Sequence, residues 1–228
     1  MYCRIWKKGS FMKKENHALQ IVYIILLSVQ VPFNLFYLWL GLTQMEKMTA
    51  VFLYFGIAAL FFGAVGILGI VNVVKSFRAY RRGDLEYCLK AMLKLKYGMV
   101  PFFIVNLLGM TMIFLLALVA SRGTIILMFP AVAFFIGLGV LCTWLAMLPG
   151  SFYAFQVARF AEKEGKTTRG RMILHMILQC LFLVDVLDAA YLSVKHWKRG
   201  RVGAILIGLL YGIVIIGCVA AVMALSGK

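Results

Sequence analysis

The sequence predicts an all-α, polytopic integral membrane protein that forms a single transmembrane helical domain over residues 1–228. Composition is the first reason: 64% of the 228 residues are hydrophobic and only 14% are charged, whereas soluble domains average about 45–50% apolar and 25% charged residues. The second reason is that six apolar runs of 20 or more residues recur along the chain. About 20 helical residues cross a ~30 Å hydrocarbon core, and a backbone in lipid must satisfy its polar groups internally, so we expect each run to be a helix.

The six hydrophobic helices are expected to follow one another with short polar connections. They cover Leu19–Leu42, Thr49–Val74, Met99–Ala120, Thr124–Leu148, Met172–Val194 and Val202–Leu225. The first run is longer than the apolar core of a typical signal peptide, and no small-residue cleavage site follows it. We therefore expect it to be a retained span.

Positive charge alternates from one connection to the next. Of the 24 Lys and Arg residues, five precede the first helix, seven lie within residues 75–96 and five within residues 159–171. The connections after the first and third helices hold only Lys47 and Arg122. Because basic residues concentrate in cytoplasmic loops, this alternation predicts a cytoplasmic N-terminus.

Three cytoplasmic segments follow from this orientation: a basic N-terminus over residues 1–18, an amphipathic segment over 75–98, and a helix and loop over 150–171. The net charge of +16 is then explained by attraction to the anionic inner leaflet of a bilayer. Nucleic acid is not an expected partner, because the basic residues follow the membrane topology. The predicted location is the bacterial cytoplasmic membrane.

The fifth helix, Met172–Val194, is marginal as a span. Its twelve Leu, Ile, Phe and Val residues contribute roughly −4 to −7 kcal/mol to insertion, and two central aspartates cost about 5 to 7 kcal/mol. If it crosses, 18 basic residues lie inside and 6 outside; if it does not, the distribution is 21 against 3. If this segment forms one helix, His175 and Gln179 lie on nearly the opposite face from Asp185 and Asp188. A helix at the membrane surface has a single polar face, so we expect a buried span or a re-entrant helix.

The two acids of this segment, Asp185 and Asp188, are the main candidates for an intramembrane polar site. Ionisable residues within a membrane are costly and mark functional positions by default. We expect both to point into the bundle or a wet crevice, with Asn34 or Gln30 of the first helix within reach. Lys195 is expected to offset part of the charge of Asp188. The alternative to a functional site is that this pairing has a purely structural role.

A shorter amphipathic helix is expected between the second and third spans, over Asp84–Tyr97. Asp84 can cap its start, and Glu86, Lys90 and Lys94 recur every four residues along one stripe. Such a helix either lies on the membrane surface or docks a cytoplasmic partner such as an ATPase.

A faint internal repeat divides the chain into three helical hairpins. The segment SFRAY (Ser76–Tyr80) follows the second span, and SFYAF (Ser151–Phe155) follows the fourth, 75 residues later. The pattern favours three pseudo-repeated hairpins of similar length, an arrangement that is common in transporters.

Sequence motifs assign no chemistry. There is no P-loop, zinc-protease, nucleophile-elbow or dinucleotide-binding motif, and the three histidines and five cysteines are too dispersed for a metal site. We therefore assign no catalytic residue, metal or cofactor. The leading hypothesis is a non-enzymatic, transport-related (permease-like) subunit. An accessory or immunity protein that acts by helix packing, and a membrane-embedded enzyme using Asp185 and Asp188, are the alternatives.

Two stretches resemble small multi-pass membrane proteins of unknown function from Gram-positive anaerobes. They are LKLKYGMVPFFIVNLL (Leu93–Leu108) and ILHMILQCLFLVDVLDAAYL (Ile173–Leu192). The resemblance implies a multi-pass membrane protein and no particular activity. The size and six-span layout are also similar to those of the membrane subunits of bacteriocin-type ABC exporters.

Overall fold

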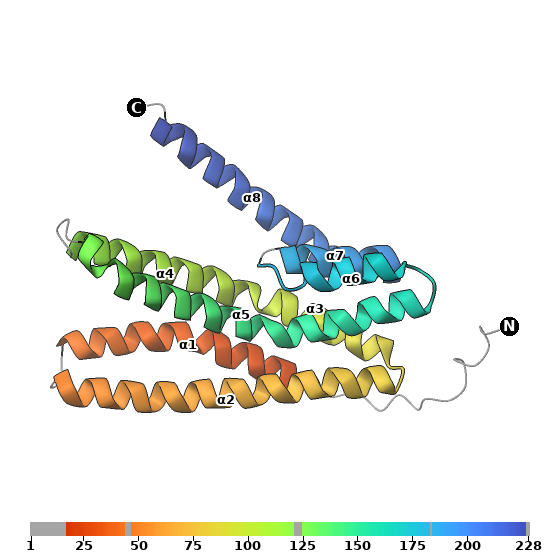
Figure 1. Cartoon of the computed structure of the whole chain (residues 1–228), viewed down its shortest axis with the longest axis horizontal. Helices are drawn as coiled ribbons and strands as arrows, with labels where there is room; N and C mark the ends of the chain where they lie inside the picture. The colour runs from red at the N-terminus through yellow and green to blue at the C-terminus, as the bar shows by residue number, and fades with distance from the viewer. Residues whose placement is uncertain (1–16, 44–46, 121–124, 183, 227–228) are drawn as a thin grey trace.

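The computed structural model describes residues 17–43, 47–120, 125–182 and 184–226. These residues form eight helices and no strand, which confirms the all-α class. The helices are α1 (Ala18–Thr43), α2 (Lys47–Arg81), α3 (Leu85–Gly98), α4 (Val100–Ala120), α5 (Ile125–Lys163), α6 (Arg169–Leu178), α7 (Val184–Trp197) and α8 (Arg201–Ser226) (Figure 1). The basic segment before His17 lies outside the described residues.

Three helices in this part of the chain are long and apolar enough to cross a membrane, judged by length and composition. The stretches are Phe52–Arg81 in α2, Leu85–Met112, which runs through α3 into α4, and Val132–Lys163 in α5. Shorter apolar stretches, Ala18–Gln30 and Arg201–Ile213, lie within α1 and α8, which have 26 residues each.

The two longest helices, α2 and α5, are longer than is needed to cross a membrane. α2 has 35 residues and α5 has 39, so they are about 52 and 58 Å long at 1.5 Å per residue. Both exceed the ~30 Å of a hydrocarbon core. At the end where α2 and α5 finish they pack with α3, and α5 also packs with α6 and α7 (Figure 1).

α3 is a core helix and not only a surface element. Its start is capped by Asp84, whose Oδ1 accepts the backbone N–H of Tyr87 at 3.0 Å. Half of its residues, seven of fourteen, are buried, because α3 packs against α1, α2, α5 and α7. The stripe of Glu86, Lys90 and Lys94 is exposed. Met99 alone separates α3 from α4.

The prediction of a single continuous helix over Met172–Val194 is wrong. α6 ends at Leu178, α7 begins at Val184, and the chain reverses between them. Polar contacts between the two short helices close the resulting hairpin.

Both ends of the α6–α7 hairpin lie at the same end of the bundle. Before α6, the Lys166 ammonium lies 3.5 Å from the ring centroid of Trp197, the last residue of α7. After α7, the Arg199 guanidinium donates to Glu86 Oε1 at 2.9 Å, and Glu86 is in the first turn of α3. The hairpin therefore returns to the end of the bundle at which it began.

Because of this reversal, the last third of the chain does not form the third of the three long hairpins expected from the sequence. The first two similar segments do lie in packed helices, since the rings of Phe77 in α2 and Phe152 in α5 are 5.7 Å apart. In the last third, however, α6 and α7 have only 10 and 14 residues. The hairpins are therefore not of similar length.

Candidate functional site

A buried ion pair joins α3 to α7. Lys96 Nζ lies 2.6 Å from Asp185 Oδ2, and the two side chains are 2% and 1% exposed. Removing two charges from water costs several kcal/mol for each ion, and only close pairing with further hydrogen bonds offsets that cost. The burial of each charged side chain is therefore tolerated only because the other is present.

Ser151 of α5 connects this pair to the hairpin. Its Oγ accepts a hydrogen bond from Lys96 Nζ at 2.9 Å and donates to the Gln179 carbonyl at 2.7 Å. Gly150 makes room for the lysine, because a Cβ at that position would lie 3.3 Å from Lys96 Cε. One hydroxyl thus links α3, α5 and the point where α6 ends.

The second acid closes the hairpin on itself. Asp188 Oδ1 lies 2.6 Å from His175 Nδ1, and its Oδ2 accepts from Gln179 Nε2 at 2.8 Å. His175 and Gln179 are four residues apart, and Asp185 and Asp188 are three apart, so each pair occupies one face of its helix. The reversal brings these two polar faces together. Below, "the charged cluster" means Lys96, Ser151, His175, Gln179, Asp185 and Asp188.

Side chains of α5 satisfy the backbone where the hairpin turns. The carbonyl of Gln179 accepts from Ser151, as above, and the carbonyl of Cys180 accepts from Trp144 Nε1 at 3.1 Å. Non-helical backbone at membrane depth is tolerated where protein groups pair with it.

The formal charges of the cluster do not balance when both acids are ionised. Lys96 supplies one positive charge, whereas Asp185 and Asp188 supply two negative charges when ionised. Asp185 gains further stabilisation from its place in the first turn of α7, where the helix dipole favours an anion. The remaining contacts of Asp188 are with the His175 ring and the Gln179 amide, and an uncompensated charge in such a buried place is costly.

A second histidine lies between the cluster and the end of α7. The ring of His175 stacks on Tyr191 at 5.7 Å and meets the ring of His196 edge-on at 6.5 Å. Burial, and then the nearby His175, Lys195 and Lys166, lower the pKa of His196. His196 therefore favours the neutral form, which can accept a proton.

The expected partners of the acids differ from the observed ones. Lys195, expected beside Asp188, instead donates to the Tyr191 hydroxyl. In the described part of the chain, Gln30 takes no part in the polar contacts of either acid, and it lines a separate cavity. The side chain of Asn34 lies outside the described residues.

The exposed stripe of α3 is a second candidate site. Glu86 pairs with Lys90 at 2.9 Å and with Arg199 at 2.9 Å, and all three side chains are about half exposed. Lys94 is also exposed. The stripe thus presents lysines to the surroundings at the end of the bundle where α2 finishes.

Lys96 and Ser151 were not predicted from the sequence as site residues. A signal for Lys96 was present, because it lies off the stripe of Glu86, Lys90 and Lys94 and so on the apolar face of the helix. Ser151 carried no such signal, since a serine in an apolar helix commonly bonds to its own backbone.

One family model matches most of the chain. It is described as "Family of unknown function (DUF6652)" and matches residues 16–199, a range that contains the whole charged cluster. No curated protein and no solved structure matches the chain. Among the described residues, no group of three or more His, Cys, Asp or Glu is placed to hold a metal ion.

Proposed function

Since the chain belongs to the family of unknown function DUF6652, we propose a role for it from its own geometry. The protein is a multi-pass protein of the bacterial cytoplasmic membrane and acts, without covalent catalysis, as a transport-related, permease-like subunit. The charged cluster at the reversal of the α6–α7 hairpin carries this proposal. Buried ionisable groups mark ion and proton pathways in membrane proteins, and interrupted helices form transporter sites.

In the proposed topology the chain crosses the membrane five times, through α1, α2, α4, α5 and α8. The α6–α7 hairpin enters and leaves on the cytoplasmic side, where the N-terminus also lies. This arrangement places 21 of the 24 Lys and Arg residues inside, in accord with the positive-inside rule. It replaces the sixth crossing expected from the sequence and puts the end of α8 outside.

Proton binding is the proposed trigger. A proton on Asp185 removes the counter-charge of Lys96, and a buried lysine without a counter-charge is strongly unfavourable. The contact between α3 and α7 then weakens, while Ser151 still holds the carbonyl of Gln179. We propose that the hairpin shifts against α3 and α5 in response, and that this movement couples proton binding to transport.

Fluorescence of Trp144 tests this linkage, because its indole N–H contacts the hairpin at Cys180. A variant with Trp6→Phe, Trp39→Phe and Trp197→Phe keeps Trp144 as the single reporter. In lipid nanodiscs its emission maximum should shift between pH 8 and pH 5.

Two further variants, made in the single-tryptophan background, complete the experiment. Lys96→Met with Asp185→Leu removes the ion pair without leaving a buried charge, and should abolish the shift. Glu86→Gln alters only the two exposed ion pairs of Glu86, with Lys90 and Arg199, and should retain the shift. No shift in the parent, or an unchanged shift without Lys96 and Asp185, would refute the proton linkage.

Docking of a cytoplasmic partner such as an ATPase is a second proposed role, favoured by the exposure of Lys90 and Lys94 on a helix of which half the residues are buried. Such a partner would present acidic residues to them. Co-purification with an ATPase encoded by a neighbouring gene tests it, and the double variant Lys90→Glu, Lys94→Glu should lose the complex. Retention of the complex by this variant would exclude the stripe of Glu86, Lys90 and Lys94 as the docking site.

A further inference from the structure

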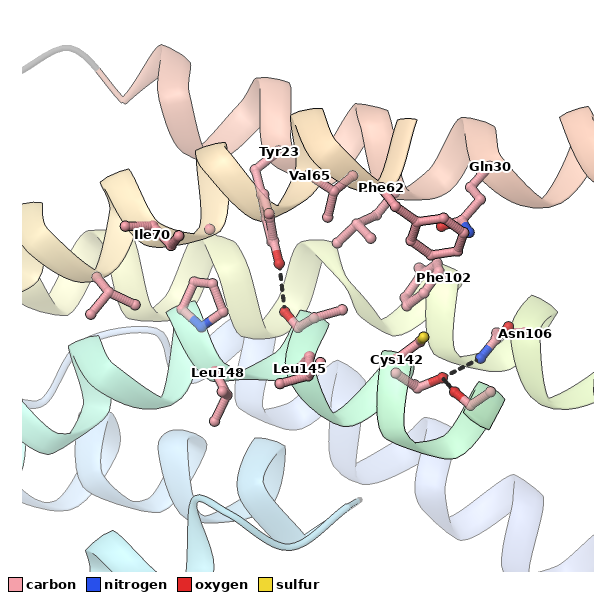
Figure 2. A pocket seen from close by; sticks show the side chains of 18 of the residues that line it. Tyr23, Gln30, Phe62, Val65, Ile70, Phe102, Asn106, Cys142, Leu145 and Leu148 are labelled. Carbon is pink, nitrogen blue, oxygen red and sulfur yellow. Dashed lines mark hydrogen bonds between the residues drawn. The ribbon is translucent and has the colours of Figure 1, made fainter. Parts of the chain in front are cut away.

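A cavity of about 580 Å³ lies between α1, α2, α4 and α5 (Figure 2). Its volume falls within the range of about 300–1,000 Å³ typical of small-molecule sites. The described residues that line it include no Asp, Glu, Lys, Arg or His. The cavity therefore suits an uncharged occupant.

The walls of the cavity are mainly hydrocarbon. Phe62 and Ile70 of α2 and Leu145 of α5 line it, and these residues are 47%, 66% and 50% exposed. Gly66 lines the same wall, and no heavy atom of the described residues lies within 4 Å of a Cβ built there. In a membrane these surfaces meet lipid, so an apolar molecule can reach the cavity from the bilayer.

One end of the cavity is polar. Figure 2 shows Gln30 and Asn106 toward one end and Ile70 toward the other. Asn106 donates to the Thr143 hydroxyl at 2.6 Å, which in turn donates to a backbone carbonyl at 2.7 Å.

Gln30 lines that end and makes no hydrogen bond with any other described residue. Its amide can donate and accept, whereas the Tyr23 hydroxyl, also in the lining, already donates to the Ala146 carbonyl at 2.9 Å. An amide that faces an apolar cavity, with no hydrogen-bond partner among the described residues, favours a ligand with one polar group, since a lost hydrogen bond there is costly.

We propose that the cavity binds a neutral, lipid-like molecule. Its hydrocarbon chain lies along the α2 and α5 walls, and a single hydroxyl or carbonyl group pairs with the amide of Gln30. A charged headgroup would find no counter-charge in the lining. The inference rests on the proposed membrane insertion, but it is independent of the charged cluster.

Photolabelling with a long-chain primary alcohol that carries an alkyl diazirine tests the proposal. The wild-type chain is placed in nanodiscs of phosphatidylethanolamine and phosphatidylglycerol, and labelled peptides are identified by mass spectrometry. Saturable labelling of cavity peptides, competed by the same alcohol without diazirine, is expected.

Two glycine variants separate the cavity from the lipid-facing surface. Gly63 and Gly66 both lie on α2, both are exposed, and a Cβ at either position has no heavy atom within 4 Å. Only Gly66 lines the cavity. Gly66→Phe should therefore reduce labelling to background, whereas Gly63→Phe should leave it unchanged. Equal labelling of the two variants, or labelling that does not saturate, would show ordinary lipid contact and overturn the proposal.

The polar end is tested with an alkane probe of the same chain length. Wild type should prefer the alcohol by about three- to tenfold, the value of one hydrogen bond in such a setting. Gln30→Leu should remove this preference and still bind the alkane. An equal preference in both proteins would overturn the assigned role of Gln30. Labelling should persist in the Lys96→Met, Asp185→Leu variant, so failure of the proton linkage and failure of this site can be told apart.

Discussion

The ammonium group of Lys96 in α3 and the carboxylate of Asp185 in α7 lie 2.6 Å apart, and neither side chain is more than 2% exposed. The two residues are 89 positions apart in the chain. Their pairing fixes the α6–α7 hairpin against α3, and Ser151 fixes the same lysine to α5. The position of the hairpin in the bundle therefore depends on this buried ion pair.

Removing one member of the pair should be far more damaging than removing both. Lys96→Met or Asp185→Asn leaves a buried charge without its partner, and each should lower the free energy of unfolding by about 3–5 kcal/mol. The double variant Lys96→Met, Asp185→Leu should recover much of this loss. Thermal unfolding of the purified protein in detergent measures the three values.

Lys94→Met is the matched control, because Lys94 is an exposed residue of the same helix. It should change stability by less than about 0.5 kcal/mol. Additive losses in the double variant would contradict a coupled pair.

Asp188→Asn should be milder than Asp185→Asn. An asparagine can still accept from Gln179 and donate to a neutral His175, so no buried group is left without a partner. We expect a loss of about 0.5–1.5 kcal/mol, the net value of one hydrogen bond. Unfolding measured under the same conditions compares the two variants, and equal losses would mean that Lys96 is not the specific partner of Asp185.

The start of α3 offers a separate test of helix capping. Asp84→Ala removes the bond from Tyr87 N–H to the Asp84 carboxylate and should cost about 1 kcal/mol. Thr168 occupies the corresponding position before α6 but makes no side-chain capping bond. Thr168→Ala should therefore have little effect in the same unfolding assay, and a loss as large as that of Asp84→Ala would contradict this account of the cap.

The helical class could be predicted from the sequence because a long apolar run in lipid satisfies its own backbone hydrogen bonds by forming an α-helix. It failed at the fifth segment for a specific reason. His175 and Gln179 fall on one face of a continuous helix and Asp185 and Asp188 on the opposite face. Opposed polar faces on one apolar helix indicate either a buried span or a fold that turns them together, and the structure shows the second.

The partner of Asp185 was harder to predict. Lys96 was counted among the basic residues of a cytoplasmic segment, because charge distribution along the chain reports the membrane side and not the burial of each residue. Its side chain is buried only because α3 packs against α5 and α7. Long-range pairing of this kind depends on tertiary packing, which local periodicity does not contain.

Cysteine accessibility around α8 tests most directly whether the charged cluster lies in a hairpin that returns to the cytoplasmic side. Arg201→Cys and Lys228→Cys, each in a cysteine-free background, are labelled with a membrane-impermeant maleimide in intact and in permeabilised cells. Position 201 begins α8 and should label only after permeabilisation, whereas position 228, beyond α8, should label in intact cells. Labelling of position 201 in intact cells would show that Met172–Val194 crosses the membrane, and would contradict the account.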